Sequence, residues 1–247
     1  MTHFLKNISL VFTFLLVLVQ HTKGQEQFLP FDTIAPYTDA LKIINGEEWT
    51  YVKKYVGQPF FKNEDWNKAN VKCDGIVFPE MDVKYNIETD DLILFVKKGD
   101  RAFSYILNKQ IINSFEFSTE DNSKPYLFSY TRLDQNTPKA FYTKLYDGEL
   151  NYYVRFQKYI NKVISGNYTG EYVLHALMYL EMDGRIFELD TKRQLFSLLE
   201  DRKTEIKKFM KKQRIKFDHK RPEDLIAVFS YYDSLKPISL NADAPQH

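Results

Sequence analysis

Side chains that could ligate a metal or transfer a proton are few and widely spaced in this chain. Beyond the first 24 residues the sequence holds three histidines, His175, His219 and His247, and one cysteine, Cys73. None of the histidines forms an HxH or HExxH pair, the spacings that direct two imidazoles at one ion. His175 falls within a stretch typical of a strand, so we expect a hydrogen-bonded strand residue. Neither a zinc site nor any other cofactor is expected.

Motifs of the common enzyme classes are missing from the sequence. It has no GxSxG nucleophile elbow, no GxxxxGK[ST] phosphate loop and no GxGxxG fingerprint. A glycosidase would need two carboxylates several ångströms apart across a cleft. The acidic pairs are Glu47-Glu48, Glu80/Asp82, Asp90-Asp91 and Asp147/Glu149. Most coincide with turns, which favours surface turn chemistry, and none has the DxDxDG spacing of a calcium loop. Whether the protein is an enzyme stays open, with a hydrolase as the least favoured interpretation.

One segment has a strongly unbalanced charge. Residues 202–221 contain ten Lys or Arg against two acids, a local excess of +8. Candidate contacts to a partner or surface are Lys207, Lys208, Lys211, Lys212 and Arg214. Such a cluster could bind an anionic envelope surface, an acidic protein or a glycan. The alternative is a solvated helix face that balances an acidic body.

The first 24 residues have the features of a signal peptide. Lys6 precedes an apolar run at residues 8–19, and Thr22-Lys23-Gly24 places small residues at the positions required for cleavage before Gln25. The run is well short of the roughly 20 residues that cross a bilayer, which favours a removed leader over a retained anchor helix. No cysteine stands at the cleavage site. We therefore expect an exported protein in the periplasm, at the cell surface or outside the cell, without a lipid anchor.

Composition limits the partners and the source of stability. The leader carries two lysines and no acid, so its removal lowers the net charge from +1 to about −1 and leaves about −9 outside residues 202–221. A near-neutral chain whose Phe209 and Phe217 look like core residues is not expected to bind nucleic acid. A single cysteine cannot form an internal disulfide, so packing must stabilise the fold, and Cys73 is expected to be a free, partly buried thiol.

Apolar and polar side chains alternate from about residue 49 to residue 189. Clear examples are Phe115/Phe117, Tyr126/Phe128/Tyr130 and Tyr152/Val154/Phe156. A period of two predicts half-buried antiparallel strands. Asp-Gly pairs such as Asp183-Gly184 predict tight hairpin turns. Together they predict roughly ten strands, with the clearest hairpin joining Tyr172–Glu181 to Arg185–Leu189, and an aromatic content of 16% suits such a sheet.

Helical periodicity replaces this alternation near the C-terminus. Thr191 and Gln194 have the spacing of a capping box, a second helix is expected over Thr204–Gln213, and a third begins at Pro222. Short helices need support, so their apolar stripes should pack on the sheet. The predicted fold is α+β and mainly β, an antiparallel curved sheet or incomplete barrel with two or three C-terminal helices. The predicted division is a signal peptide (1–24), a lead-in segment (25–46), a β domain (47–190), a helical segment (191–237) and a disordered tail (238–247).

The order of these features resembles a broad set of uncharacterised exported proteins of the Bacteroidota. The matching parts are Gly57-Gln58-Pro59-Phe60-Phe61, Val83-Lys84-Tyr85-Asn86-Ile87 before an acidic turn, Lys192–Glu200 ahead of Glu205–Lys212, and Tyr231-Tyr232-Asp233 within Glu223–Leu235. That set usually has Tyr-Tyr-Asn where this chain has Tyr-Tyr-Asp. The resemblance implies a bacterial, periplasmic or surface location, and it transfers no site residues.

Two functional hypotheses follow. The leading one is an exported, non-enzymatic envelope protein that binds or scaffolds a partner or surface. The second is a carrier that holds an apolar ligand or lipid in a half-barrel lined by Tyr and Phe, although core packing explains the same rings. An open aromatic cavity would favour the carrier, and a filled sheet would favour the surface-interaction protein.

Overall fold

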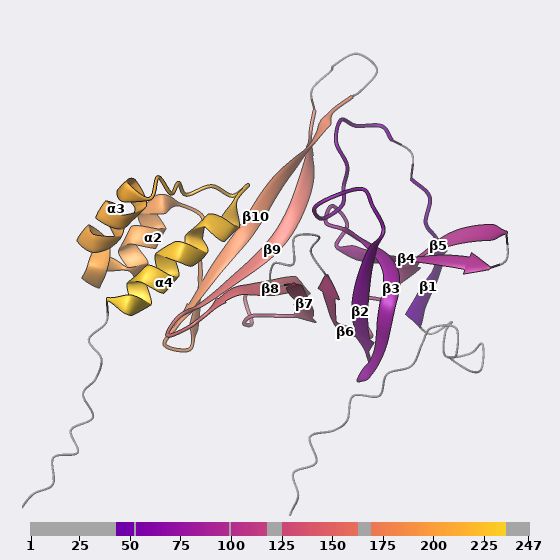
Figure 1. Cartoon of the computed structure of the whole chain (residues 1–247), viewed down its shortest axis with the longest axis horizontal. Coiled ribbons are helices and arrows are strands. Elements are labelled where there is room, and N and C mark those ends of the chain that lie inside the picture. Colours follow the sequence, from indigo (N-terminus) through magenta and orange to yellow (C-terminus); the bar gives the residue numbers. More distant parts are fainter. Residues whose placement is uncertain (1–42, 52, 99, 118–124, 163–168, 236–247) are drawn as a thin grey trace, which may run out of the picture.

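The computed structural model describes residues 43–51, 53–98, 100–117, 125–162 and 169–235 (Figure 1). The expected signal peptide, most of the lead-in segment and the C-terminal tail lie outside the described residues. Within these ranges, no helix combines the length and the hydrophobicity needed to span a bilayer.

In the described part of the chain, eleven antiparallel strands form one sheet, in the order β1-β5-β4-β3-β2-β6-β7-β8-β9-β10-β11. They are β1 (Ile44–Glu48), β2 (Asn67–Cys73), β3 (Ile76–Asn86), β4 (Asp91–Lys98), β5 (Arg101–Leu107), β6 (Ile112–Phe117), β7 (Tyr126–Thr131), β8 (Ala140–Asp147), β9 (Asn151–Asn161), β10 (Glu171–Met182) and β11 (Arg185–Glu188). The sheet is open, with β1 and β11 at its edges, and the predicted fold class is confirmed. The sheet begins inside the predicted lead-in segment, because Ile44 pairs with Leu107 of β5.

Aromatic contacts show how strongly the sheet curls. Tyr85 of β3 and Phe141 of β8 are separated by four strand steps, or about 19 Å in a flat sheet. Their ring centroids nevertheless lie only 5.6 Å apart. Phe115 of β6 and Phe128 of β7 fill the space between them, each in contact with Tyr85. The concave face is therefore largely packed with rings, as in a half-barrel.

A segment that we call the strap, residues 55–61, spans the opening of this half-barrel. Near its start, the Val56 N–H donates to Gly170 O at 2.9 Å, next to β10. At its end, the Phe61 N–H donates to Tyr85 O of β3 at 2.8 Å. The strap thus fastens two strands that are far apart in the sheet.

The C-terminal helices gather beside β8, β9 and β10 (Figure 1). They are α2 (Lys192–Leu198), the 3-10 turn η2 (Glu200–Arg202), α3 (Lys203–Lys212), the 3-10 turn η3 (Pro222–Leu225) and α4 (Ile226–Ser234). The predicted capping box of Thr191 and Gln194 is present at the start of α2. Packing on the sheet is also confirmed, since the Phe229 ring of α4 lies 4.8 Å from the Tyr152 ring of β9.

Cys73 and Asp90 are both more buried than the sequence predicts. Cys73 is free and buried, and burial together with the nearby Asp74 raises the pKa of its thiol to about 12. The expectation of surface turn chemistry is wrong for Asp90, which is only 9% exposed. The Tyr85 hydroxyl donates to Asp90 Oδ1 at 2.6 Å, so the carboxylate has a buried partner instead of water.

Candidate functional site

A pocket of about 450 Å³ lies where the end of the strap, the sheet and the chain before η3 meet. We call it the mouth pocket. It is lined by Phe61, Lys62, Ile87, Tyr126, Phe156, Lys158, Leu174, Lys220, Arg221, Glu223 and Asp224. Its volume falls within the range of small-molecule sites, about 300–1,000 Å³.

One part of the lining is apolar. Phe61 and Phe156 are buried, with ring centroids 4.9 Å apart, and Ile87 and Leu174 extend this wall. Phe61 reaches the pocket because the strap crosses the opening of the half-barrel, while Phe156 and Leu174 project from neighbouring strands. The wall can shield the hydrocarbon part of a ligand from water, which is the main favourable contribution to binding such a group.

Lys158 of β9 is the most unusual polar group of the pocket. Its Nζ donates to Gln58 O at 2.8 Å and to Phe60 O at 2.7 Å, both in the strap. It forms no ion pair with a carboxylate anywhere in the described part of the chain. Burial lowers the pKa of Lys158 to about 8, against a smaller opposing effect of Glu64. An ammonium has three N–H donors, so one remains after the two carbonyls are satisfied.

Three polar groups from different parts of the chain close one side of the pocket. The Tyr126 hydroxyl donates to Glu223 Oε1 at 2.7 Å, and Lys62 Nζ donates to both groups at 3.1–3.3 Å. Burial lowers the pKa of Lys62, but the hydrogen bond to Tyr126 and the charge of Glu223 outweigh it, and the net shift is upward. Glu223 is therefore already neutralised by partners within the protein.

The remaining charged groups come from the chain that enters η3. Arg221 Nε lies 3.6 Å from Asp224 Oδ2 and 3.8 Å from Asp218 Oδ2. Lys220 is exposed and makes no ion pair with the described residues. The lining thus holds four cations and two carboxylates, and both carboxylates have cationic partners. This imbalance makes the pocket suited to an anion.

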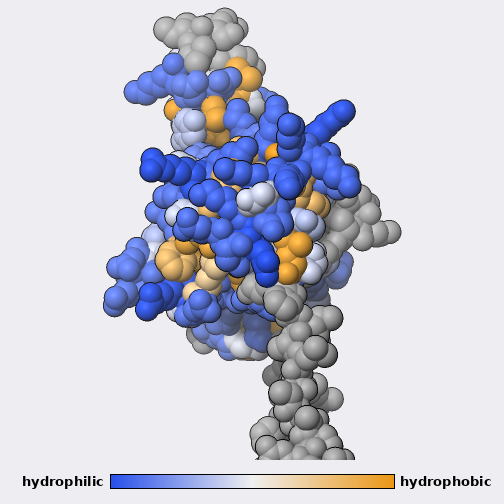
Figure 2. Space-filling model, turned by 90° about the vertical axis from the view of Figure 1, so that its left-hand side faces the viewer, coloured by the Kyte–Doolittle hydropathy of each residue, from blue (hydrophilic) through white to orange (hydrophobic). Residues whose placement is uncertain are grey.

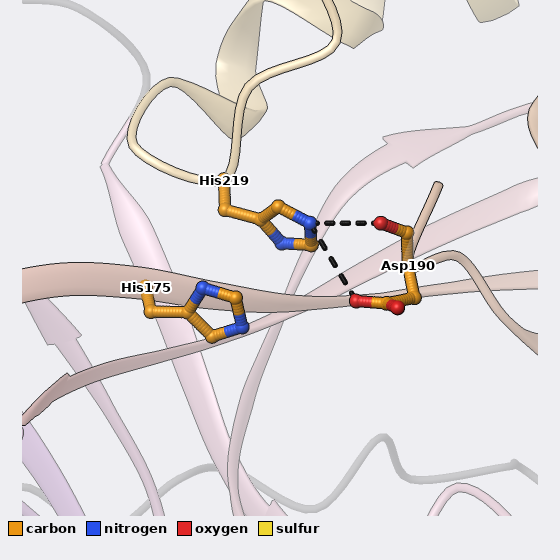
Figure 3. A group of neighbouring side chains, drawn as sticks. All are labelled: His175, Asp190 and His219. Atoms are coloured by element: carbon orange, nitrogen blue, oxygen red, sulfur yellow. Dashed lines mark hydrogen bonds and ion pairs between the residues drawn. The ribbon is translucent and has the colours of Figure 1, made fainter. Parts of the chain in front are cut away.

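His219 fixes this part of the chain to β10, and Figure 3 shows its contacts with Asp190 beside the ring of His175. Its Nδ1 lies 2.8 Å from Ala176 O and its Nε2 lies 2.9 Å from Asp190 O. The Ala176 N–H also donates to His219 O at 2.9 Å. Because Lys220 and Arg221 follow His219 directly, this clasp sets the position of one wall of the mouth pocket.

His175, Asp190 and His219 also place possible metal-ligand atoms within 4.8 Å of one another. The geometry does not suit an ion. The two imidazole rings stack at 4.3 Å with an interplanar angle of 18°, so their in-plane lone pairs run side by side instead of converging. Both His219 nitrogens already face carbonyl oxygens. We therefore interpret the cluster as a structural clasp.

The five cations predicted from the sequence lie together at the helical end of the molecule. Lys207, Lys208, Lys211, Lys212 and Arg214 are all exposed. We call them the α3 cationic surface. On the same helix Ile206 and Met210 are buried, which turns the lysines outward. Figure 2 views this end and shows a largely hydrophilic surface.

The mouth pocket itself was missed by sequence reasoning, although the sequence contained one signal for it. The sequence predicts that one face of a strand is buried and carries Tyr152, Val154 and Phe156. Lys158 lies two residues after Phe156 and therefore on the same face. A charged residue on the buried face of a strand needs a special environment. The Gly57–Phe61 stretch forms the main part of the strap. In the sequence it stands out only as a match to the exported proteins that the chain resembles, and it does not indicate a pocket.

Comparison with protein-family models, curated proteins and solved structures finds no match for this chain. Its function must therefore be inferred from the site itself.

Proposed function

We propose that this is an exported, non-enzymatic binding protein whose mouth pocket holds a small amphipathic anion. The acidic head of the ligand lies against Lys158 and Lys220, and its hydrocarbon part lies against the wall formed by Phe61 and Phe156. Export rests on the features of the leader sequence alone. The packed rings of the concave face disfavour a carrier that holds its ligand inside the half-barrel. We therefore assign the ligand to the mouth pocket, as an anion with a hydrocarbon part instead of a purely apolar molecule.

The observation that carries this proposal is Lys158. A partly buried ammonium without a carboxylate partner among the described residues is unfavourable in the unliganded protein, since desolvation disfavours the charged form. An anionic head would supply the missing counter-charge in a site of reduced dielectric. A neutral apolar ligand would leave that ammonium uncompensated, and a small ion would leave the apolar wall in contact with water.

The pocket offers little support for catalysis. Glu223 is held by Lys62 and Tyr126, and Asp224 is paired with Arg221, so neither carboxylate is placed as a free general base. The His219 ring nitrogens are likewise engaged by backbone carbonyls. These contacts favour binding and positioning over turnover.

Calorimetric titration with octanoate, octanol and acetate tests the proposal. We expect octanoate to bind more tightly than either of the other two, because it alone satisfies both the charge and the apolar wall. Binding should weaken as the pH rises through about 8, since Lys158 then loses its proton. Equal affinity for octanoate and octanol would rule out the anionic head.

Two variants locate the site. Lys158→Met should weaken octanoate binding by about 10-fold or more, as expected for loss of a charge-assisted contact, and should remove the pH dependence near 8. Lys97→Met changes an exposed lysine of β4 that does not line the pocket, and should bind as the unmodified protein does. Equal binding by both variants would place octanoate elsewhere.

A further inference from the structure

The α3 cationic surface holds like charges close together. Lys207 and Lys211 are four residues apart, as are Lys208 and Lys212, so each pair lies on one row of the helix surface. Like-charge pairs at this spacing destabilise an isolated helix by the same amount that opposite charges stabilise it. The acid in the first turn of α3, Glu205, precedes both rows and separates neither pair.

Counter-charges are also missing around these side chains. None of the five cations forms an ion pair with a carboxylate of the described residues. Among these five cations, Lys207 makes a cation–π contact within the described residues, with its Nζ 5.3 Å from the centre of the Phe196 ring. The cations therefore present their charge to whatever approaches the helical end.

The composition of this surface distinguishes between possible partners. Protein interfaces are enriched in aromatic residues and Arg and depleted in Lys, and they are centred on a buried anchor. Here four of the five cations are lysines, and Phe209 is stacked on Tyr231 at 4.1 Å and so turned toward α4. Clusters of four to eight Lys or Arg on an amphipathic helix such as α3 are typical of attraction to anionic lipid headgroups.

The negative charge of the rest of the chain would orient the protein on an anionic surface. The total is +1 and residues 202–221 contribute +8, so the remaining sequence is negative. An anionic surface would attract the helical end and repel the β body. We propose that the α3 cationic surface docks the protein, helical end first, on a membrane rich in anionic lipid. This inference goes beyond ligand binding in the mouth pocket and does not depend on it.

Vesicle sedimentation tests the docking. The full chain is incubated with phosphatidylcholine vesicles that do or do not contain phosphatidylglycerol. Binding to the neutral vesicles is subtracted, because the apolar run of the leader can contribute to both. We expect tighter binding to the anionic vesicles, and we expect this excess to fall steeply as salt is added, because surface attraction is screened.

Matched charge variants separate the surface from the net charge. The test variant combines Lys207→Gln, Lys208→Gln, Lys211→Gln and Lys212→Gln, in which Gln keeps a good helix propensity. The control combines Lys54→Gln, Lys97→Gln, Lys139→Gln and Lys162→Gln, four exposed lysines outside the helices. The test variant should lose about 10-fold or more of the anionic-vesicle affinity, and the control should stay within about 2-fold.

Other outcomes contradict the proposal. An equal loss in both variants would mean that net charge alone drives binding. No excess binding to anionic vesicles at low salt would exclude a lipid surface. Tighter binding to polyglutamate than to vesicles of equal charge would replace the lipid with an acidic protein. Circular dichroism of both variants checks that the helices are retained.

Discussion

The imidazole rings of His175 and His219 stack with their centroids 4.3 Å apart, although the two residues are 44 positions apart in the sequence. One ring belongs to β10 and the other to the chain that leads into η3. His219 Nε2 also contacts the carbonyl and carboxylate oxygens of Asp190, which lies between β11 and α2. The stability of this junction should therefore respond to pH.

Acidification should weaken the fold through His175. Burial and the neighbouring His219 lower the pKa of His175, against a smaller opposing effect of Asp190. Below pH of about 6.5 the unfolded chain takes up a proton that the folded protein resists, so the free energy of unfolding falls, and the loss is complete below the lowered pKa. Urea denaturation at a series of pH values measures this decrease.

The matched variant is His175→Phe, which keeps a ring against His219 but cannot be protonated. Its stability should depend less on pH below about 6.5 than that of the unmodified protein. The same slope in both proteins would show that other groups, such as carboxylates, account for the acid sensitivity.

Raising the pH should strengthen the unliganded fold through Lys158. The pKa of this lysine is lowered to about 8 from 10.5, so between these values the folded protein releases a proton that the unfolded chain keeps. The free energy of unfolding should therefore rise as the pH increases from 8 to about 9.5. Lys158→Met should lack this increase, and an identical rise in the variant would assign the effect to another residue.

Removing one hydroxyl should destabilise the core. Tyr85 is fully buried and its hydroxyl donates to Asp90 Oδ1. Burial raises the pKa of Asp90, although this hydrogen bond and the charge of Arg155 oppose the shift. Tyr85→Phe should lower the free energy of unfolding by about 1.5–3 kcal/mol, because a buried acceptor loses its donor. Tyr130→Phe, which removes a long 3.3 Å bond to exposed Gln110, is the control and should cost less than about 1 kcal/mol.

Gly148 should not tolerate even a methyl group. A Cβ at this position would overlap Asp233 Oδ2 and would lie 2.7 Å from the Tyr146 ring. Asp233 accepts a hydrogen bond from the Tyr146 hydroxyl at 2.7 Å, which holds the end of α4 against the β8–β9 turn. Gly148→Ala should lower the free energy of unfolding by about 1–3 kcal/mol, the usual cost of overpacking.

A double-mutant cycle tests the cause at Gly148. In an Asp233→Ala background the added methyl group meets fewer atoms, so Gly148→Ala should cost less there than in the unmodified protein. Strictly additive costs would show that the clash with Asp233 is not responsible.

Local patterns were sufficient for most of the fold. The alternation of Tyr152, Val154 and Phe156 predicts one buried face of β9, and all three are at most 3% exposed. Thr191 caps α2 and Pro222 opens η3, because both effects depend on the nearest residues. The Asp183-Gly184 turn also joins β10 to β11 as expected, with a positive φ at both residues.

Contacts between residues that are far apart in the sequence could not be predicted in the same way. Lys158 finds its acceptors about 100 residues earlier in the chain, at Gln58 and Phe60. His175 meets His219 only because the last segment folds back on β10. No local pattern of apolar and polar residues predicts these contacts, because they depend on how the whole sheet curls. The α3 cationic surface was visible in the sequence because its charges are contiguous, and its role stays a proposal.

The strap has a thermodynamic consequence for any molecule in the mouth pocket. Its carbonyls hold Lys158, its Phe61 forms part of the wall, and its backbone joins β3 to the chain beside β10. Detaching it would break all three kinds of contact in one event. Occupancy and attachment of the strap are therefore linked equilibria: a ligand that binds only the fastened form raises the free energy needed to detach the strap.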